Sequence, residues 1–519
     1  MKFKAVLMIS AGLAIAACGN SPSRTDPATE QAEREWRVSP DDVTPAALKA
    51  AATDDRVKRF YAARQWQPAW TKSGVGSLLD SLDQAQAHAL ELRIFLPAKA
   101  PSDPSQVDAA LTKAALDYAD ALANGRVKPD KIRDIYTLKT PKPDLSAGLA
   151  AAIEQKKVGE WLTSLAPQTD EYKALSQAYL QYRKQAAEGV TGAIRDNGDA
   201  IEVGQSDPRV PRLVEALQSN GYLPDDDDKK ADGEPQASAA YTPAIANAVK
   251  QMQADYGIKP DGIVGSDTLE VLNTGPARRA RQLAVNLERL RWLDRTPPAT
   301  RVDVNTAAAV LEYWKDGQLR DQRGVVVGEP GKETPQLAAP LFRLVANPTW
   351  TVPESIAEEE LAGKGSAYFA ANNMIHKDGM IVQQPGPKNS LGQVKFDMKD
   401  DYAIYLHDTP AKALFDVSQR QRSHGCVRVQ DALGFARMLA DEQGVREKFE
   451  EGLASGDETF VDLPQDIPVR LMYRTAFWDG SRVRFRADAY GWDEDVAQAL
   501  GLDANGRRVL RTQPGDVGP

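Results

Sequence analysis

The residue types best suited to covalent chemistry lie close together in the C-terminal half of the chain. The sequence reads Ser423-His424-Gly425-Cys426, and His407 precedes this stretch. A cysteine thiol with its ordinary pKa of about 8.5 is mostly protonated at neutral pH, and a nearby imidazole can take up the proton to give the reactive thiolate. These residue types therefore indicate a nucleophilic cysteine that a histidine activates.

The cysteine count supports the same interpretation. Cys18 and Cys426 are the two cysteines of the chain. The residues before Cys18 have a basic start, a short apolar run over 5–17 and small residues at its end, which is typical of an export signal. In an oxidising compartment an unpaired thiol is a liability unless its chemistry is used, so Cys426 is the candidate nucleophile.

The tetrad Ile-Ala-Ala-Cys at residues 15–18 resembles the bacterial lipobox, whose cysteine receives a diacylglycerol before the signal is removed. The resemblance implies that residues 1–17 are a signal peptide, that Cys18 becomes a lipidated N-terminus unable to form a disulfide, and that residues 18–43 are a polar tether. The protein is then a membrane-anchored lipoprotein of the periplasm. A simple secretory signal, with a cysteine near its end by chance, is the alternative. No other stretch is apolar enough to cross a bilayer.

Length and charge limit the classes of protein to which the chain can belong. A chain of 519 residues, 42% of them hydrophobic, is long enough for about three domains with ordinary soluble cores. Its formal net charge of −9 is spread without a long basic run, and nucleic-acid binding depends on clustered lysine and arginine. We expect a multidomain globular protein without a nucleic-acid partner.

Helical segments precede the candidate nucleophile. Over 44–200, apolar residues recur at three- and four-residue spacing, as in the run 108–122, which predicts a helical domain. No constellation of catalytic groups occurs there. We assign this region a scaffold role.

Residues 207–275 predict a small helical module. In the turn 260–269, glycines permit tight turns, and Ser266 or Asp267 can cap the helix that begins near Thr268. The turn resembles the Asp-Gly-x-x-Gly-x-x-Thr turn of the common peptidoglycan-binding helical domain, which implies glycan binding. The alternative is that it merely joins two helices.

A β-rich domain is expected over 280–475, because the sequence from Ala299 changes to short runs of β-branched and aromatic residues. His407 ends one of these runs, which begins at Tyr402, so a neighbouring element could bring it beside Cys426.

Two further segments complete the chain. The stretch 347–396, with many Gly, Pro and Asn residues, is too long for an ordinary loop and predicts a lid insertion. Residues 476–519 form a C-terminal extension that holds aromatic residues up to Trp492 and then an unpatterned polar end.

The pattern His-x(15)-Ser-His-Gly-Cys-Val-Arg, which begins at His407, resembles the signature of the L,D-transpeptidase (YkuD-type) catalytic domain. The likeness extends to the larger subfamily that joins a scaffold, a peptidoglycan-binding domain and a lidded catalytic domain, over roughly residues 45–495. The implied fold class is multidomain α+β, with a helical scaffold, a small helical peptidoglycan-binding-like domain and a β-rich catalytic domain. The segments that widen the likeness are Val325–Gly328, Asn347–Pro353, Gln384–Pro387 and His407–Pro410.

The resemblance implies a role for each residue of the motif. Cys426 is the nucleophile, and His407 is the base, oriented by a backbone carbonyl. Backbone amides around Gly425 and Cys426 supply an oxyanion hole. Arg428 either organises the site and holds a substrate carboxylate or fixes the loop through a salt bridge. The oxyanion and substrate pocket comprises Ser423, His424, Gly425 and Arg428.

The reaction implied is acyl transfer between peptidoglycan stem peptides, without a cofactor. Cys426 attacks the carbonyl that joins the L-centre of diaminopimelate to the terminal D-alanine of a donor tetrapeptide, and D-alanine leaves. The side-chain amine of another stem then takes the thioester, giving a 3→3 cross-link. Water as acceptor gives carboxypeptidase activity, and a D-amino acid gives exchange. The implied process is cell-wall synthesis and the maintenance of cell shape.

Two rival interpretations remain. His407, His424 and Cys426 could bind zinc, but the chain lacks a further Cys-x-x-Cys or His-Glu-x-x-His partner, so no metal is expected. A non-catalytic, lipid-tethered peptidoglycan-binding protein is the second, and the intact histidine and cysteine argue against it. His376 is interpreted as a lid or surface residue and His88 as structural.

Overall fold

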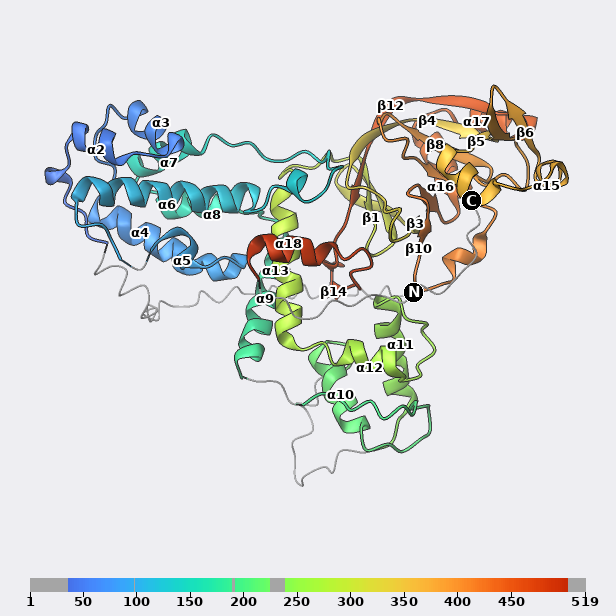
Figure 1. Cartoon of the computed structure of the whole chain (residues 1–519), viewed down its shortest axis with the longest axis horizontal. Coiled ribbons are helices and arrows are strands. Elements are labelled where there is room, and N and C mark those ends of the chain that lie inside the picture. Colours follow the sequence, from blue (N-terminus) through green and yellow to red (C-terminus); the bar gives the residue numbers. More distant parts are fainter. Residues whose placement is uncertain (1–35, 98, 189–191, 225–238, 503–519) are drawn as a thin grey trace, which may run out of the picture.

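The computed structural model describes residues 36–97, 99–188, 192–224 and 239–502. The expected signal peptide and the lipobox cysteine Cys18 lie outside these residues. Figure 1 shows a group of N-terminal helices, a small helical module and a β-rich body, with the long helix α13 (Pro276–Trp292) between them. The predicted fold class, multidomain α+β, is confirmed. In the described ranges, no helix is both long and apolar enough to span a bilayer.

The N-terminal helices pack around α6 (Pro104–Asn124), which contains the predicted run 108–122. Asp103 caps the first turn of α6 by accepting a hydrogen bond from Gln106 N–H at 2.9 Å, and Pro104 takes the first helical position, where no N–H is needed. Most of α6 is buried because helices cover it on several sides. The other main helices of this region are α2 (Pro45–Ala51), α3 (Asp55–Ala63), α4 (Lys72–Asp83), α5 (Leu92–Phe95), α7 (Leu145–Glu154), α8 (Val158–Leu165) and α9 (Asp170–Glu188).

Helix α13 connects the helical part of the chain with the β-rich part. It packs against α6 and α9 and also against α18 (Trp492–Leu500) near the C-terminus. Arg291 and Glu288, both fully buried on α13, form an ion pair at 2.5 Å, and Arg291 also donates to the Tyr172 hydroxyl of α9 at 2.9 Å. The ion pair neutralises both buried charges within α13, and the hydrogen bond from Arg291 to Tyr172 connects α13 to α9.

The small helical module is held together at the turn before its last helix. Gln253 accepts a hydrogen bond from Gly262 N–H at 2.8 Å and donates to the Ile263 carbonyl at 2.9 Å. The predicted cap is wrong: Gly265 occupies the N-cap position, and no side chain caps the helix. The helix starts at Ser266, so both candidate side chains lie inside its first turn instead of before it. The module consists of α10 (Val210–Ser219), α11 (Pro243–Asp255) and α12 (Ser266–Leu272).

The β-rich body is built on one closed sheet. Its strand order is β10-β3-β11-β9-β8-β4-β12-β1-β2, and β2 also pairs with β3, which closes the ring. Closure removes the unpaired strand edges that an open sheet exposes. The strands are β1 (Arg301–Asn305), β2 (Val310–Lys315), β3 (Gln318–Gly328), β4 (Ala338–Ala346), β8 (Val394–Met398), β9 (Leu406–His407), β10 (Gln421–Ser423), β11 (Val427–Val429) and β12 (Thr459–Met472).

The apolar core of this body combines strand residues with residues of α16 (Ala432–Glu442) and α17 (Arg446–Ser455). Leu406 and Val427, which flank the candidate catalytic residues, belong to it and are fully buried. The strand predicted from Tyr402 is wrong in its first part. Ala403 has a φ of +56°, which turns the chain there, so strand pairing begins only at Leu406.

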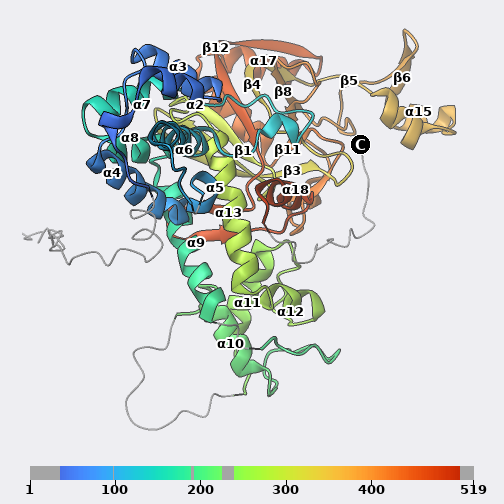
Figure 2. The same ribbon diagram turned by 60° about the vertical axis from the view of Figure 1, so that its left-hand side comes forward.

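The insertion between β4 and β8, residues 347–393, forms a separate lobe, here called the lid lobe. It has its own three-stranded sheet in the order β5-β7-β6 and its own apolar cluster around Trp350, Ile356 and Leu361. Figure 2 shows β6 and α15 projecting away from the β-rich body. The predicted end at residue 396 is too late, because β8 begins at Val394. Its elements are β5 (Trp350–Thr351), α14 (Glu354–Ile356), the π-helical turn η5 (Ala357–Leu361), α15 (Ser366–Ala371), β6 (Met374–Lys377) and β7 (Met380–Gln383).

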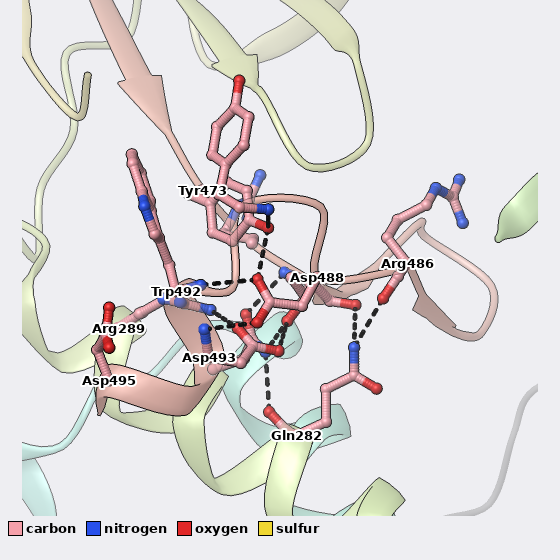
Figure 3. A network of polar contacts seen from close by, with 12 residues as sticks. Gln282, Arg289, Tyr473, Arg486, Asp488, Trp492, Asp493 and Asp495 are labelled. Carbon is pink, nitrogen blue, oxygen red and sulfur yellow. Dashed lines mark hydrogen bonds and ion pairs between the residues drawn. The ribbon is translucent and has the colours of Figure 1, made fainter. Parts of the chain in front are cut away.

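The C-terminal extension is structured in its described part, against the expectation of an unpatterned polar end after Trp492. It forms β13 (Ala476–Trp478), β14 (Val483–Phe485) and α18. The polar residues of α18 have specific partners: Asp493 pairs with Arg289 of α13, and Asp495 pairs with Arg133. Figure 3 shows this network around Asp488 and Asp493. Trp492, Val496 and Leu500 recur at four-residue spacing and are buried, so the sequence carried a helical signal here that the prediction missed.

Candidate active site

Cys426 and His407 lie on neighbouring strands. β9 and β11 run parallel, with Leu406 opposite Val427. Cys426 directly precedes β11 and is level with Tyr405, whose carbonyl accepts a hydrogen bond from Val427 N–H at 3.1 Å. Side chains alternate along a strand, and Leu406 and Val427 point into the apolar core. The residues on the opposite face are therefore Tyr405, His407, Cys426 and Arg428.

His407 is held as a neutral base and is 4% exposed. Its Nδ1 forms a hydrogen bond with the backbone carbonyl of Asp408, which can only accept, so Nδ1 carries the proton and Nε2 keeps its lone pair. Burial, together with the positive charges of Arg428 and Lys395, lowers the pKa of His407 to about 3. The ring is uncharged at neutral pH, and its free nitrogen can accept a proton.

Cys426 is partly buried, and its thiol is protonated at neutral pH. Burial raises the pKa of the thiol, while hydrogen bonds with the backbone and side chain of Tyr405 oppose the rise. Sγ also donates to the Ala403 carbonyl at 3.8 Å, a contact that only the thiol form can make. At rest, both groups are uncharged: Cys426 is a thiol and His407 is a neutral imidazole.

Tyr405 is a site residue to which the sequence analysis gave no role. Its ring centroid lies 5.6 Å from that of His407, and its hydroxyl hydrogen-bonds with Cys426 and Trp350. Burial and the nearby thiol raise the pKa of Tyr405 well above its ordinary value, so the hydroxyl remains a donor. The two-residue alternation of a strand was the available signal, since Tyr405 precedes His407 by two positions.

The loop that carries the nucleophile is braced by its own residues. The Ser423 hydroxyl donates to the Cys426 carbonyl at 2.6 Å and accepts a hydrogen bond from Gly425 N–H at 3.2 Å. Gly425 has a φ of +115°, a conformation that favours glycine. Outside the motif, the Thr334 hydroxyl donates to the Gly425 carbonyl at 2.7 Å, and no sequence signal marked this residue.

His424 contacts the lid lobe. Its Nε2 lies 3.0 Å from Oε1 of Glu360 on η5, and the adjacent Glu359 pairs with Lys332 at 2.5 Å. Burial, followed by the charge of Lys332, lowers the pKa of His424. The structure therefore places His424 at the boundary between the lid lobe and the nucleophile loop.

Arg428 is 2% exposed and lies on β11, opposite His407 on β9. Its charge contributes to the lowered pKa of both His407 and His424. The structure thus places Arg428 beside His407, and both of its predicted roles stay predictions.

The remaining histidines lie elsewhere. His376 is exposed on β6 of the lid lobe, with its ring centroid 5.2 Å from that of Phe369. His88 has Nδ1 3.0 Å from the Tyr172 hydroxyl in the N-terminal helical region. Across the part of the chain that the structure describes, no three His, Cys, Asp or Glu side chains are grouped so that they could hold a metal ion.

A groove of about 960 Å³ lies between the small helical module and the catalytic body. The module contributes the turn around Asp261 and Ser266, and the catalytic body contributes residues 416–419 and Arg422. The residues contributed by the catalytic body belong to the segment that joins β9 to the nucleophile loop. One long ligand could therefore contact both bodies.

Three parts of the chain match known protein families. Residues 55–179 match a model described as "Scaffold domain", residues 206–272 one described as "Putative peptidoglycan binding domain", and residues 299–457 one described as "L,D-transpeptidase catalytic domain". The resemblance inferred from the motifs is confirmed for all three regions. The catalytic match includes both His407 and Cys426.

A curated relative from Haemophilus influenzae, named "Putative L,D-transpeptidase", is 31% identical over 240 residues. The match covers 42% of this chain and 49% of the relative, so the chain spans about half the length of the curated relative that it matches. A mutant of the Enterococcus faecium L,D-transpeptidase is 13% identical, with a TM-score of 0.19 over 34% of this chain and 50% of that chain. The L,D-transpeptidase (Yku) from Stackebrandtia nassauensis is 15% identical, with a TM-score of 0.23 over 55% of this chain and 97% of that chain. Scores of this size carry no argument.

Proposed function

Because residues 299–457 are an L,D-transpeptidase catalytic domain, we propose that this protein forms 3→3 cross-links in peptidoglycan by cysteine acyl transfer. The observation that carries the proposal is the pairing of β9 with β11, which puts His407 and Cys426 on one face of the sheet. The peptidoglycan-binding domain at 206–272 supports the same substrate class.

In the first half-reaction, Nε2 of His407 takes the thiol proton as Sγ of Cys426 attacks the carbonyl carbon between diaminopimelate and the terminal D-alanine. Backbone N–H groups of the nucleophile loop stabilise the oxyanion that forms. The C–N bond then breaks, and His407 returns the proton to the leaving amine of D-alanine. The products are a thioester on Cys426 and free D-alanine.

In the second half-reaction, the side-chain amine of an acceptor stem attacks the thioester. His407 removes a proton from this amine, the C–S bond breaks, and the proton passes to the departing sulfur. The thiol and the neutral imidazole are restored. Since the complete cycle begins and ends with the same neutral thiol and imidazole, no resting thiolate is required.

The direct test uses purified protein and a disaccharide-tetrapeptide prepared from peptidoglycan. We expect free D-alanine together with a dimer whose fragmentation locates the bond between two diaminopimelate residues. A product consisting only of the tripeptide would replace transpeptidation by L,D-carboxypeptidase activity. If the tetrapeptide remained intact while the protein still bound peptidoglycan, the non-catalytic interpretation would be correct.

Lipidation of Cys18 is part of the proposal, which locates the protein in the periplasm as a membrane-anchored lipoprotein. The motivation is the lipobox-like tetrad at residues 15–18. Replacement of Cys18 by serine should move the protein from the membrane to the soluble periplasmic fraction, because the attached acyl chains provide the anchor. Fractionation followed by mass analysis of the N-terminal peptide measures this. A wild-type protein that is already soluble, with an N-terminus produced by earlier cleavage, would contradict the lipoprotein assignment.

A further inference from the structure

A chain of hydrogen bonds lies behind the nucleophile loop and reaches outside the matched catalytic domain. Thr334, which is fully buried, donates its hydroxyl proton to the Gly425 carbonyl at 2.7 Å. The same hydroxyl accepts a hydrogen bond from Gly328 N–H at 2.9 Å. A threonine hydroxyl has one proton and two lone pairs, so these two bonds have a fixed direction, from Gly328 through Thr334 to Gly425.

The Thr334 bond orients the peptide that joins Gly425 to Cys426. In a trans peptide the carbonyl and the following N–H point in opposite directions. With the Gly425 carbonyl held toward Thr334, the Cys426 N–H is directed away from it. Within the described residues, Cys426 N–H donates to no protein acceptor, so it is available to an oxygen that enters the site. This is the donor that an oxyanion beside Sγ would use.

Gly328 connects Thr334 to the C-terminal extension. The Tyr490 hydroxyl donates to the Gly328 carbonyl at 2.7 Å. Gly328 is tightly enclosed, because a Cβ there would lie 2.1 Å from the Lys332 carbonyl oxygen. The residue Gly328 is therefore held on both sides, by Tyr490 at its carbonyl and by Thr334 at its N–H.

Tyr490 is itself fixed by Tyr473, which belongs to the network of Figure 3. Its ring stacks on Tyr473 with 5.0 Å between centroids, and its N–H donates to the Tyr473 hydroxyl at 3.1 Å. Tyr473 in turn donates to Asp488 at 2.7 Å, and Asp488 accepts a hydrogen bond from Asp493 N–H at 2.9 Å. Asp493 is paired with Arg289 of α13. A continuous series of contacts therefore connects α13 to the nucleophile loop.

We propose that Thr334 and Tyr490 are positioning residues that fix the Gly425–Cys426 peptide so that its N–H stabilises the oxyanion during acyl transfer. Neither residue touches the reacting atoms. For peptidoglycan as the substrate, the inference rests on the proposed function. The position of the Cys426 N–H matters in the same way for any acyl donor that acylates Cys426.

The test compares two reactions of the same thiol in Thr334→Val and Thr334→Ser. Acylation by p-nitrophenyl acetate passes through a tetrahedral oxyanion, whereas alkylation by iodoacetamide occurs at a saturated carbon and forms none. Valine keeps the shape of threonine but loses the hydroxyl, so the acylation rate should fall by about 10- to 100-fold, somewhat less than the loss expected for removal of an oxyanion donor. The alkylation rate should stay within about twofold of wild type, and serine should restore acylation because it keeps the hydroxyl.

Tyr490→Phe is the second variant, since it removes only the hydroxyl, which is bonded to Gly328 and to Thr334. It should lower acylation by less than Thr334→Val, because Thr334 still holds Gly425, and it should again spare alkylation. Circular dichroism at the assay temperature verifies that each variant is folded. Equal losses of acylation and alkylation, or full acylation by Thr334→Val, would overturn the inference.

Turnover of the disaccharide-tetrapeptide by the same variants separates this inference from the proposed function. Thr334→Val should lower kcat and leave KM little changed if the Gly425–Cys426 peptide group stabilises the transition state. Inactivity of the wild-type protein toward the tetrapeptide would count against the proposed function. The ester and alkylation rates would still decide the role of Thr334.

Discussion

Cys426→Ala is expected to lower the release of D-alanine from the disaccharide-tetrapeptide by at least about 10⁴-fold, because the covalent step has no other nucleophile. The protein should stay folded. The side chain is partly buried at the surface of the sheet, outside the apolar core formed by Leu406 and Val427, so truncation leaves no large internal cavity. Amino-acid analysis of released D-alanine and mass analysis of the dimer measure the effect.

Cys426→Ser is the matched control for this prediction. It preserves the size and position of the side chain, yet a serine hydroxyl ionises far less readily than a thiol, and the site has only a neutral imidazole to activate it. We expect a similarly inactive protein that still binds peptidoglycan. An alanine variant that formed 3→3 cross-links at the wild-type rate would eliminate Cys426 as the nucleophile.

His407→Ala should reduce turnover by about 10²- to 10⁴-fold at neutral pH, the usual contribution of a positioned general base. Burial raises the pKa of the Cys426 thiol, so without a base the thiolate becomes abundant only above the ordinary cysteine value of about 8.5. In the wild type, His407 takes up the proton as the sulfur attacks, so alkylation of the variant by iodoacetamide should be slower than that of the wild type at pH 7 and recover as the pH rises through and above that value.

The sign of the pH dependence follows from the lowered pKa of His407. A base with a pKa of about 3 is already unprotonated throughout the range from 5 to 9. Wild-type turnover should consequently show no acid limb near the ordinary histidine value of about 6.5, and the limb due to His407 should lie near 3. An acid limb centred near 6.5 in kcat/KM, removed by His407→Ala, would contradict the neutral resting pair.

His424→Ala is the control for His407→Ala. His424 contacts Glu360 of the lid lobe. Loss of the His424 ring should therefore disturb this contact and leave His407, the base that serves Cys426, in place. Its alkylation profile should remain close to wild type. If His424→Ala alone gave the slow, pH-dependent thiol, the roles of the two histidines would have to be exchanged.

A functional site can be predicted from sequence where chemistry restricts both residue type and spacing. The motif from His407 to Arg428 identified the catalytic domain, because a nucleophile, a base and a glycine-containing loop need particular residues at particular positions. The helical scaffold and the β-rich body followed from periodicity, since long apolar runs leave a clear pattern.

Features that depend on contacts between distant residues could not be predicted from the sequence. The neutral state of His407 results from burial within the folded body and from the charge of Lys395, which approaches only through the pairing of β8 with β9. Thr334 and Tyr490 were missed for the same reason, because their hydroxyls donate to backbone carbonyls of residues far away in the sequence. The wrong prediction of the cap of α12 has a local cause. The helix begins two residues earlier than its sequence pattern suggested.

The position of β12 in the closed sheet decides how short a folded form of the β-rich body can be made. β12 lies between β4 and β1, yet it begins at Thr459, after the last residue of the matched catalytic domain. A polypeptide that stopped at residue 457 would contain the whole motif and still lose the strand that joins two parts of the ring. The smallest self-sufficient unit for expression must therefore extend beyond Met472, and a gene fragment chosen from sequence similarity alone would produce an aggregating protein.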